Sequence, residues 1–274
     1  MKRNSAPIDI HPGPVHKVVD LLIEGASETL KRQFPGEWPP PKKISELPVA
    51  QVAGKSRVIM TVEIEFPLTE PGHRPHLSGA FYRIKAMLVT YNKRLGAMGT
   101  RARLHDDGRV PIFLPRDVTV GDLAMAAGHP GQFHWLHEWL FGRLIHELGH
   151  ARDPGGPMAK PFQPEWRGAY LDDPVERVAF KVQVFHQCAA LWDHALEEMR
   201  NHGGTKLQAF KWTLVNAEAW ENAVNQGSEA AKKDILKSVY QGFVREGWLP
   251  PLPNDQGAFL SKLLAQVQDE VSER

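Results

Sequence analysis

Residues 144–153, LIHELGHARD, place two histidines four positions apart, with a glutamate directly after the first. Residues four apart on an α-helix share a face, so His146 and His150 can both bind one ion at about 2.0–2.1 Å. Glu147 projects beside the pair, where it can take a proton from a water that zinc activates. Chance would produce such a motif in roughly one chain in 25 of this composition, which favours a metal site over coincidence.

The residues around the motif predict a helix over 131–151 that holds the histidines rigidly. Gly149 costs about 1 kcal/mol against alanine inside a helix, which indicates close approach of another backbone. The pair His137 and Glu138, in HEWLF, lacks a second histidine and is a near miss. Apolar residues form a core-facing stripe along the helix: Leu140, Leu144, Ile145 and Leu148.

The chain after the motif identifies the class of zinc protein. Asp153 and Gly156 stand where the extended metzincin pattern has glycine and its third histidine, which excludes that pattern. Residues 169–180, AYLDDPVERVAF, contain the order Tyr…Pro-x-Glu-x-x-Ala. With HELGH, this order resembles the gluzincin branch of zinc metallopeptidases, especially the minigluzincin-like type, over about residues 100–200.

The resemblance implies a zincin-like catalytic core that holds one Zn²⁺ ion. By this resemblance His146, His150 and Glu176 are the metal ligands and Glu147 is the general base. A catalytic zinc needs three protein ligands and one open position, and an anionic ligand complements two neutral histidines. Tyr170 is expected to donate to the oxyanion of the reaction, with packing ahead of the next helix as its alternative role.

Other residues compete for these roles. Glu176 also fits a capping box, with Asp173 as N-cap and Pro174 at the first helical position. The aspartate that follows the ligand glutamate by four residues in thermolysin-like members is Phe180 here, so Asp153, Asp172 or a backbone carbonyl is left to orient a ligand histidine. The reserve ligands and oxyanion donors are Glu165, Asp172, His186, His194 and His202; the last two are expected to be ordinary surface histidines.

The rest of the chain predicts an α+β, mostly helical fold with a small mixed sheet, an active-site helix and a helical C-terminal half. Helices are expected over 15–34 and 79–96, and a half-buried strand over 57–66. Asp107 and Gly108 predict a hairpin. The strand after it, RVPIFLP, contains two prolines and should lie at a sheet edge. A long helix from about 173 to 200 is followed by further helices, broken at 202–204, Gly227 and 247–255.

Three segments are expected: residues 1–45 as an N-terminal helix and proline-rich linker, 46–200 as the zincin-like core, and 201–274 as a helical region packed on it. Cys188 is expected to be a buried, inert thiol. Four aromatic residues at helical spacing are expected to lie in the core, with lining of the substrate pocket as the alternative: Phe133, Trp135, Trp139 and Trp192.

The composition narrows the partners. The 33 Lys and Arg balance 32 Asp and Glu, which argues against nucleic acid or an anionic membrane as partner. No transmembrane stretch or signal-peptide pattern is found, so a cytoplasmic protein is expected, although export without a signal is left open. The sequence does not determine the oligomeric state.

Together these features predict a zinc-dependent endopeptidase that binds a protein or peptide substrate as an extended strand on the sheet edge. The alternative is a zinc-stabilised binding or regulatory module without proteolytic activity. A third possibility is a latent protease whose residues 1–45 cover the site.

Overall fold

The structure is a computed structural model that describes residues 12–34, 36, 38–47, 58–67, 81–90, 109–129, 134–151, 171 and 174–273. By their internal contacts, residues 9–154 form one compact unit and residues 155–274 belong to a second. We call the two parts the N-terminal unit and the C-terminal unit and describe each by itself. The boundaries at residues 45 and 200 that the sequence suggests stay predictions.

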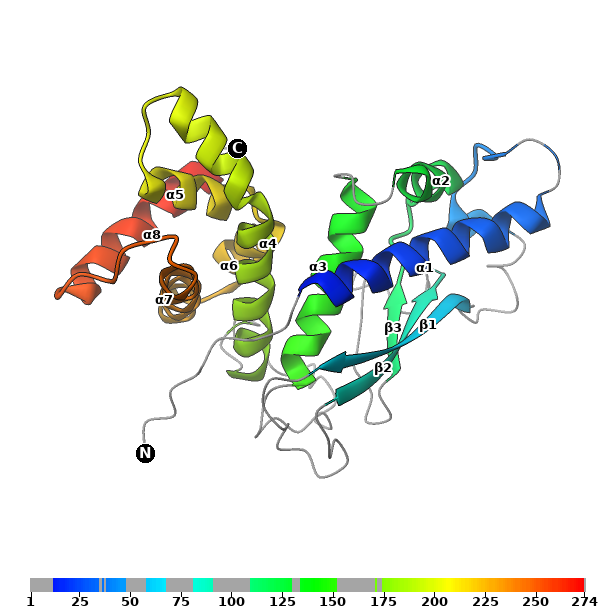
Figure 1. Cartoon of the computed structure of the whole chain (residues 1–274), viewed down its shortest axis with the longest axis horizontal. Coiled ribbons are helices and arrows are strands. Elements are labelled where there is room, and N and C mark those ends of the chain that lie inside the picture. The colour runs from blue at the N-terminus through cyan, green and yellow to red at the C-terminus, as the bar shows by residue number, and fades with distance from the viewer. Residues whose placement is uncertain are drawn as a thin grey trace. The chain divides into compact units, whose positions relative to one another are not determined.

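The N-terminal unit begins with helix α1, Pro12–Gln33. Its buried side chains recur at three- and four-residue spacing. The helix packs on two strands of the sheet, β1, Val58–Pro67, and β2, Phe81–Val89 (Figure 1). The helix approaches the sheet closely, because a Cβ atom on Gly25 would lie 2.4 Å from Cε of Met60 in β1. The predicted helix over 15–34 is therefore confirmed.

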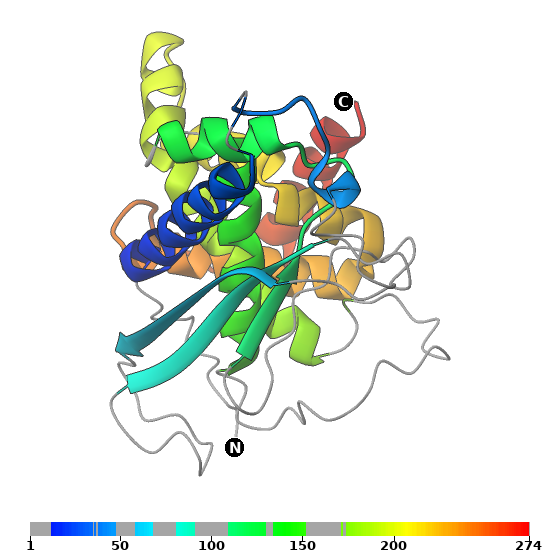
Figure 2. The ribbon, with the colours of Figure 1, turned by 90° about the vertical axis from the view of Figure 1, so that its right-hand side faces the viewer.

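The three described strands form one mixed sheet in the order β1-β2-β3 (Figure 2). Strand β1, Val58–Pro67, pairs antiparallel with β2, Phe81–Val89, and β2 pairs parallel with β3, Arg109–Phe113. The predicted strand over 57–66 and the small mixed sheet are confirmed. Strand β3 pairs with β2 alone among the described strands, and within that set it has the edge position that the sequence predicts.

The helix expected over 79–96 is wrong, because its centre is strand β2. Side chains in β2 alternate: Ala86 and Leu88 are fully buried, whereas Lys85 and Met87 are partly exposed. The ammonium group of Lys85 pairs with Oε1 of Glu63 across the strands at 2.7 Å. Alanine, methionine, leucine and lysine favour helices in isolation, but pairing with β1 and β3 overrides that preference.

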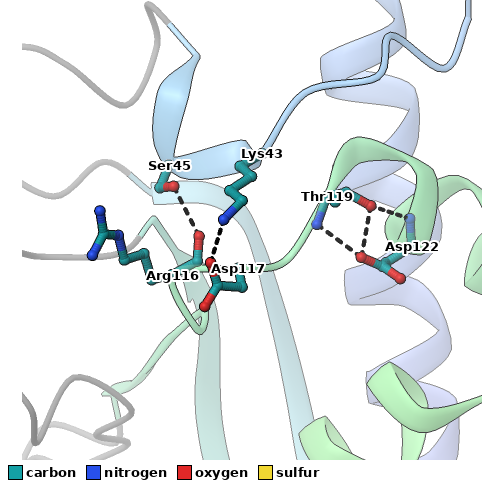
Figure 3. Close-up of polar contacts among 6 residues, drawn as sticks. All are labelled: Lys43, Ser45, Arg116, Asp117, Thr119 and Asp122. Carbon is teal, nitrogen blue, oxygen red and sulfur yellow. Dashed lines mark hydrogen bonds and ion pairs between the residues drawn. The ribbon is translucent and has the colours of Figure 1, made fainter.

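A network of polar contacts joins the segment before β1 to residues 114–119, which connect β3 to the next helix (Figure 3). Lys43 forms an ion pair with Asp117, and Oγ of Ser45 donates to the carbonyl of Arg116 at 2.8 Å. The short 3-10 helix η1, Ile44–Glu46, follows Lys43. The segment from 42 to 45 is thereby fixed to the fold and belongs to the N-terminal unit.

Helix α2, Val120–Gly128, was not expected from the sequence. Its first turn carries a complete capping box, in which Oγ1 of Thr119 accepts from the amide of Asp122 and the Asp122 carboxylate accepts from the amide of Thr119 (Figure 3). The box stands in the sequence as TVGD. The helix is short, and its apolar alanine-rich pattern gives little periodicity.

The C-terminal unit consists of helices in its described part. The bounds are α4, Pro174–Asn201; α5, Lys206–Asn216; α6, Glu218–Gln226; α7, Glu229–Arg245; and α8, Gln256–Ser272. Helix α4 packs against α5, α6 and α7, and α8 packs against α5 and α7. Large aromatic and aliphatic side chains fill the core between them: Trp192, Phe210, Trp220, Leu236 and Phe243.

The predicted helical breaks at 202–204, Gly227 and 247–255 are confirmed. Gly203, with φ of 69°, takes the left-handed conformation that favours glycine. One further break, at Ala217, was not expected. The fold is thus α+β and mostly helical in the described residues, and none of the helices there has the length and apolar character needed to span a membrane.

Candidate metal centre

The histidine motif lies near the end of one continuous helix, α3, Trp135–Ala151. The predicted helix over 131–151 is therefore confirmed from Trp135 onward. Because the helix runs without a break through residues 146 and 150, the backbone places His146 and His150 one turn apart on the same face. The apolar stripe beneath them is buried as predicted: Leu140, Leu144, Ile145 and Leu148.

The two histidines continue a stripe that starts further up the helix. At about 100° per residue, positions 139, 143, 146 and 150 fall within about 60° of one another around the helix axis. The guanidinium group of Arg143 lies over the Trp139 ring, 5.5 Å from its centroid. This pair covers the same face of α3 one to two turns before the motif.

The side chains of His146 and Glu147 are buried, with 7% of each residue exposed. Burial of an imidazole and a carboxylate costs free energy unless neighbouring groups compensate for the lost water, and both residues interact with such neighbours. Gly149 is also buried. These positions are buried on a regular helix of the N-terminal unit, which suits residues that must hold a fixed geometry.

Helix α3 also packs against the edge strand β3. The carbonyl and amide groups on the far side of β3 face away from β2, and Pro111 in the strand has no amide proton to donate. The sequence predicted this combination of a motif helix with a nearby sheet edge. The binding of a substrate strand there stays a prediction.

Glu176 lies in the first turn of α4 and is partly exposed. Contacts of neighbouring side chains hold this end of the helix. The Arg177 side chain donates from Nε to the carbonyl of Leu171 at 3.1 Å, and Lys181 forms an ion pair of 2.7 Å with Asp234 of α7. Glu176 belongs to the C-terminal unit and the histidines to the N-terminal unit, so their grouping at one ion stays a prediction.

Several predicted site residues lie outside the described part of the chain. These are the side chain of His150 and all of Asp153, Glu165, Tyr170, Asp172 and Asp173. The hairpin at Asp107 and Gly108 and the aromatic ring of Phe133 are outside it as well. Among the side chains described, no three or more histidine, cysteine, aspartate or glutamate residues are arranged to hold a metal.

The remaining expectations concern single residues. His186 is buried on α4, whereas His194 and His202 are exposed, as expected of ordinary surface histidines. Trp139 and Trp192 are buried, but Trp135 is wrong as a core residue: it is 47% exposed, and its Nε1 donates to Asp122 at 3.2 Å. Cys188 is buried as predicted, and burial raises the pKa of its thiol to about 12, which disfavours the reactive thiolate.

Comparisons with models of known families, with curated proteins and with solved structures find no match for this chain.

Proposed function

We propose that this chain is a zinc-dependent metallopeptidase that hydrolyses peptide bonds. The observation that carries the proposal is the unbroken helix α3, on which HELGH holds its two histidines one turn apart and its glutamate buried beside them. The residue types fit zinc, because imidazole and carboxylate are its usual ligands in proteins.

The proposal assigns His146, His150 and Glu176 to hold the ion. Zinc, when bound, supplies a Lewis acid for the peptide carbonyl and lowers the pKa of a water molecule to about 7. Glu147 takes the proton from the attacking water and passes it to the leaving amine. Tyr170 donates a hydrogen bond to the oxyanion. The edge of β3 supports binding of the substrate as an added strand, because α3 packs against this strand.

The central test is Glu147→Gln. We expect peptide hydrolysis to fall by about 10²–10⁴-fold, because the variant has no base, while bound zinc stays at the level of the unchanged chain. Hydrolysis is measured on a labelled unfolded protein, and metal by elemental analysis of the same sample. Full turnover by this variant would refute the role of Glu147.

A matched pair of variants tests the ligands. His146→Gln should lose zinc, whereas His137→Gln should keep it, although both histidines lie on α3 and both precede a glutamate. Glu176→Gln should weaken zinc binding, which a capping role alone would leave unchanged. Equal zinc content in all three variants would contradict the proposed ligand set.

The burial of His146 and Glu147 also favours a second candidate, a zinc-stabilised binding module in which the ion is structural. Chelation separates the two. A closed structural site should unfold when its metal is removed, whereas a catalytic site with an open position should largely keep its fold. Loss of helical circular dichroism on chelation, together with no hydrolysis before it, would favour the binding module.

A further inference from the structure

A second cluster of ionisable side chains lies in the N-terminal unit, where α1 crosses α3. It consists of His16 and Asp20, one turn apart on α1, and His137 and Glu138 in the first turns of α3. Phe141 completes it. The sequence marked His137 and Glu138 only as a near miss of the zinc motif, and nothing in the proposed reaction uses them.

His137 has a carboxylate near each of its ring nitrogens. Its Nε2 lies 3.0 Å from Oδ1 of Asp20, and its Nδ1 lies 3.7 Å from Oε1 of Glu138, which is ion-pair range. Only 7% of the His137 side chain is exposed. A neutral imidazole has one N–H, whereas an imidazolium has two, so only the protonated ring can direct a proton at both carboxylates.

His16 makes ring contacts instead. Its ring stacks on His137 with centroids 5.3 Å apart and planes 12° apart, and on Phe141 with centroids 4.0 Å apart and planes 9° apart. A neutral ring stacks favourably on the cationic ring of His137. A second proton would place two cations face to face in a partly buried site, where they repel each other.

The surroundings shift the two rings in opposite directions. Burial disfavours the charged form of His137, but the carboxylates of Glu138 and Asp20 outweigh it and raise its pKa above the ordinary 6.5. Burial lowers the pKa of His16 below 6.5, and the charge of His137 lowers it further, against the opposing carboxylates of Glu138 and Asp20. The acidic residue of α2, Asp122, accepts a hydrogen bond from Trp135, and neither Asp122 nor Arg109 of β3 contributes to the pKa shift of either ring.

We propose that His16 and His137 hold a single proton between them, on His137, and that this one-proton stack is a pH-sensitive latch between α1 and the helix that carries the zinc motif. The inference concerns the N-terminal unit alone and stands whether or not the chain binds zinc.

The latch makes the stability of the N-terminal unit fall on both sides of pH 6.5. We call the fall below pH 6.5 the acid limb and the fall above it the alkaline limb. The raised pKa of His137 contributes stability that is complete below 6.5 and is lost as pH rises through the folded value. The lowered pKa of His16 acts in the opposite pH range. Above pH 6.5 His16 is neutral in both the folded and the unfolded chain and has no effect on stability. As pH falls from 6.5 toward the folded pKa, the unfolded chain takes up the proton first, and stability is lost. The two histidines together favour folding most near 6.5.

The direct test is a pH titration of the full chain, with the ring nitrogens of each histidine followed by ¹H–¹⁵N NMR. We expect His137 to titrate with a midpoint above 6.5 and His16 with a midpoint below it. Substitutions in this cluster are needed only to assign the signals to His16 and His137, and the titration itself uses the unchanged chain. Equal midpoints, or a midpoint for His16 above that of His137, would overturn the proposal.

Two variants separate the limbs, with unfolding in urea measured between pH 5 and pH 8.5. His16→Phe keeps a flat ring against Phe141 but cannot take a proton, so the acid limb should shrink. His137→Gln keeps a donor for Asp20 but cannot take up a proton, so the alkaline limb should shrink. The His16 midpoint should rise, because the charge of His137 is gone. His202→Gln, at an exposed histidine of the C-terminal unit, is the control and should change neither limb. Limbs unchanged in both test variants would also overturn the proposal.

Discussion

At the scale of single residues, Gly242 of α7 shows how tightly the C-terminal unit is packed. A Cβ atom at this position would lie 2.6 Å from two ring carbons of Phe185, which itself packs edge-on against Phe243. The Phe185 ring is partly buried and packs against the core, so it cannot yield without moving its neighbours. We expect Gly242→Ala to lower the free energy of unfolding by about 1–3 kcal/mol in urea denaturation.

The control for this prediction is another helical glycine in the same unit. The nearest atom to a Cβ on Gly257 of α8 would be Oδ1 of Asp255 at 3.7 Å, an ordinary contact. Gly257→Ala should therefore be neutral or stabilise the unit by up to about 1 kcal/mol, because alanine favours the helix. If both substitutions change the free energy of unfolding equally, close packing at Gly242 is not the cause of the change.

Individual side chains were partly predictable from the sequence. Cys188 and Trp192 are buried because each falls on the apolar face of a long periodic helix. Trp135 was not predictable, since it lies at the very start of α3, before the helix enters the core, and its indole is held by an aspartate of a helix that the sequence did not reveal. The histidine stack was also hidden, because its members lie 121 positions apart, at residues 16 and 137.

At the scale of elements, helix α6 begins without a capping side chain of its own. Its N-cap is Ala217, and the first-turn amide of Ala219 instead donates to Oε1 of Gln187 on α4 at 2.8 Å. The usual sequence signal for a helix start is a capping residue within a few positions of it. Because the cap of α6 comes from 32 positions away, the residues around Ala217 carry no such signal, and the break there was not predicted.

This remote cap makes a prediction about stability. Gln187→Met keeps the volume of the side chain but removes the acceptor, which leaves a buried N–H without its partner. We expect a loss of about 1–3 kcal/mol in the free energy of unfolding. Gln268→Met, which breaks an exposed hydrogen bond to Glu229, is the control and should change stability by less than about 0.5 kcal/mol. A similar loss in both would show that the α6 cap has no special role.

At the same scale, one part of the candidate site was predictable from the sequence and another was not. The helix that carries His146, Glu147 and His150 was predictable because apolar spacing and the motif agree over a long segment. The proposed role of Glu176 as third ligand does not follow from spacing alone, because a glutamate in the first turn after a proline serves equally well as a helix cap. Strand β2 shows a related limit: its residues favour a helix until pairing partners are present.

At the scale of the whole molecule, α1 is part of the core of the N-terminal unit. Its buried side chains contact the sheet and α3. Removal of residues 1–45, which would test whether an N-terminal segment masks the site, also removes this helix. We expect a fragment of residues 46–154 to lose its fold, as measured by circular dichroism. A folded fragment of this length would show that α1 is dispensable and would restore truncation as a test of latency.

The C-terminal unit offers the matching experiment, because its own helices enclose a continuous apolar core from Leu171 to Val267. We expect a fragment of residues 171–274 to fold without the rest of the chain and to unfold cooperatively in urea. The fragment would fail this prediction if it showed no cooperative transition.

Cys188, the chain's only cysteine, lies on α4 in the middle of that core, and its high pKa keeps it protonated in the native protein. A thiol reagent in solution can react only in molecules that have opened far enough to admit it, since the thiolate is the reacting form. The rate of alkylation of the unmodified chain thus reports how often these helices separate, with no engineered probe needed and no second thiol to confuse the signal.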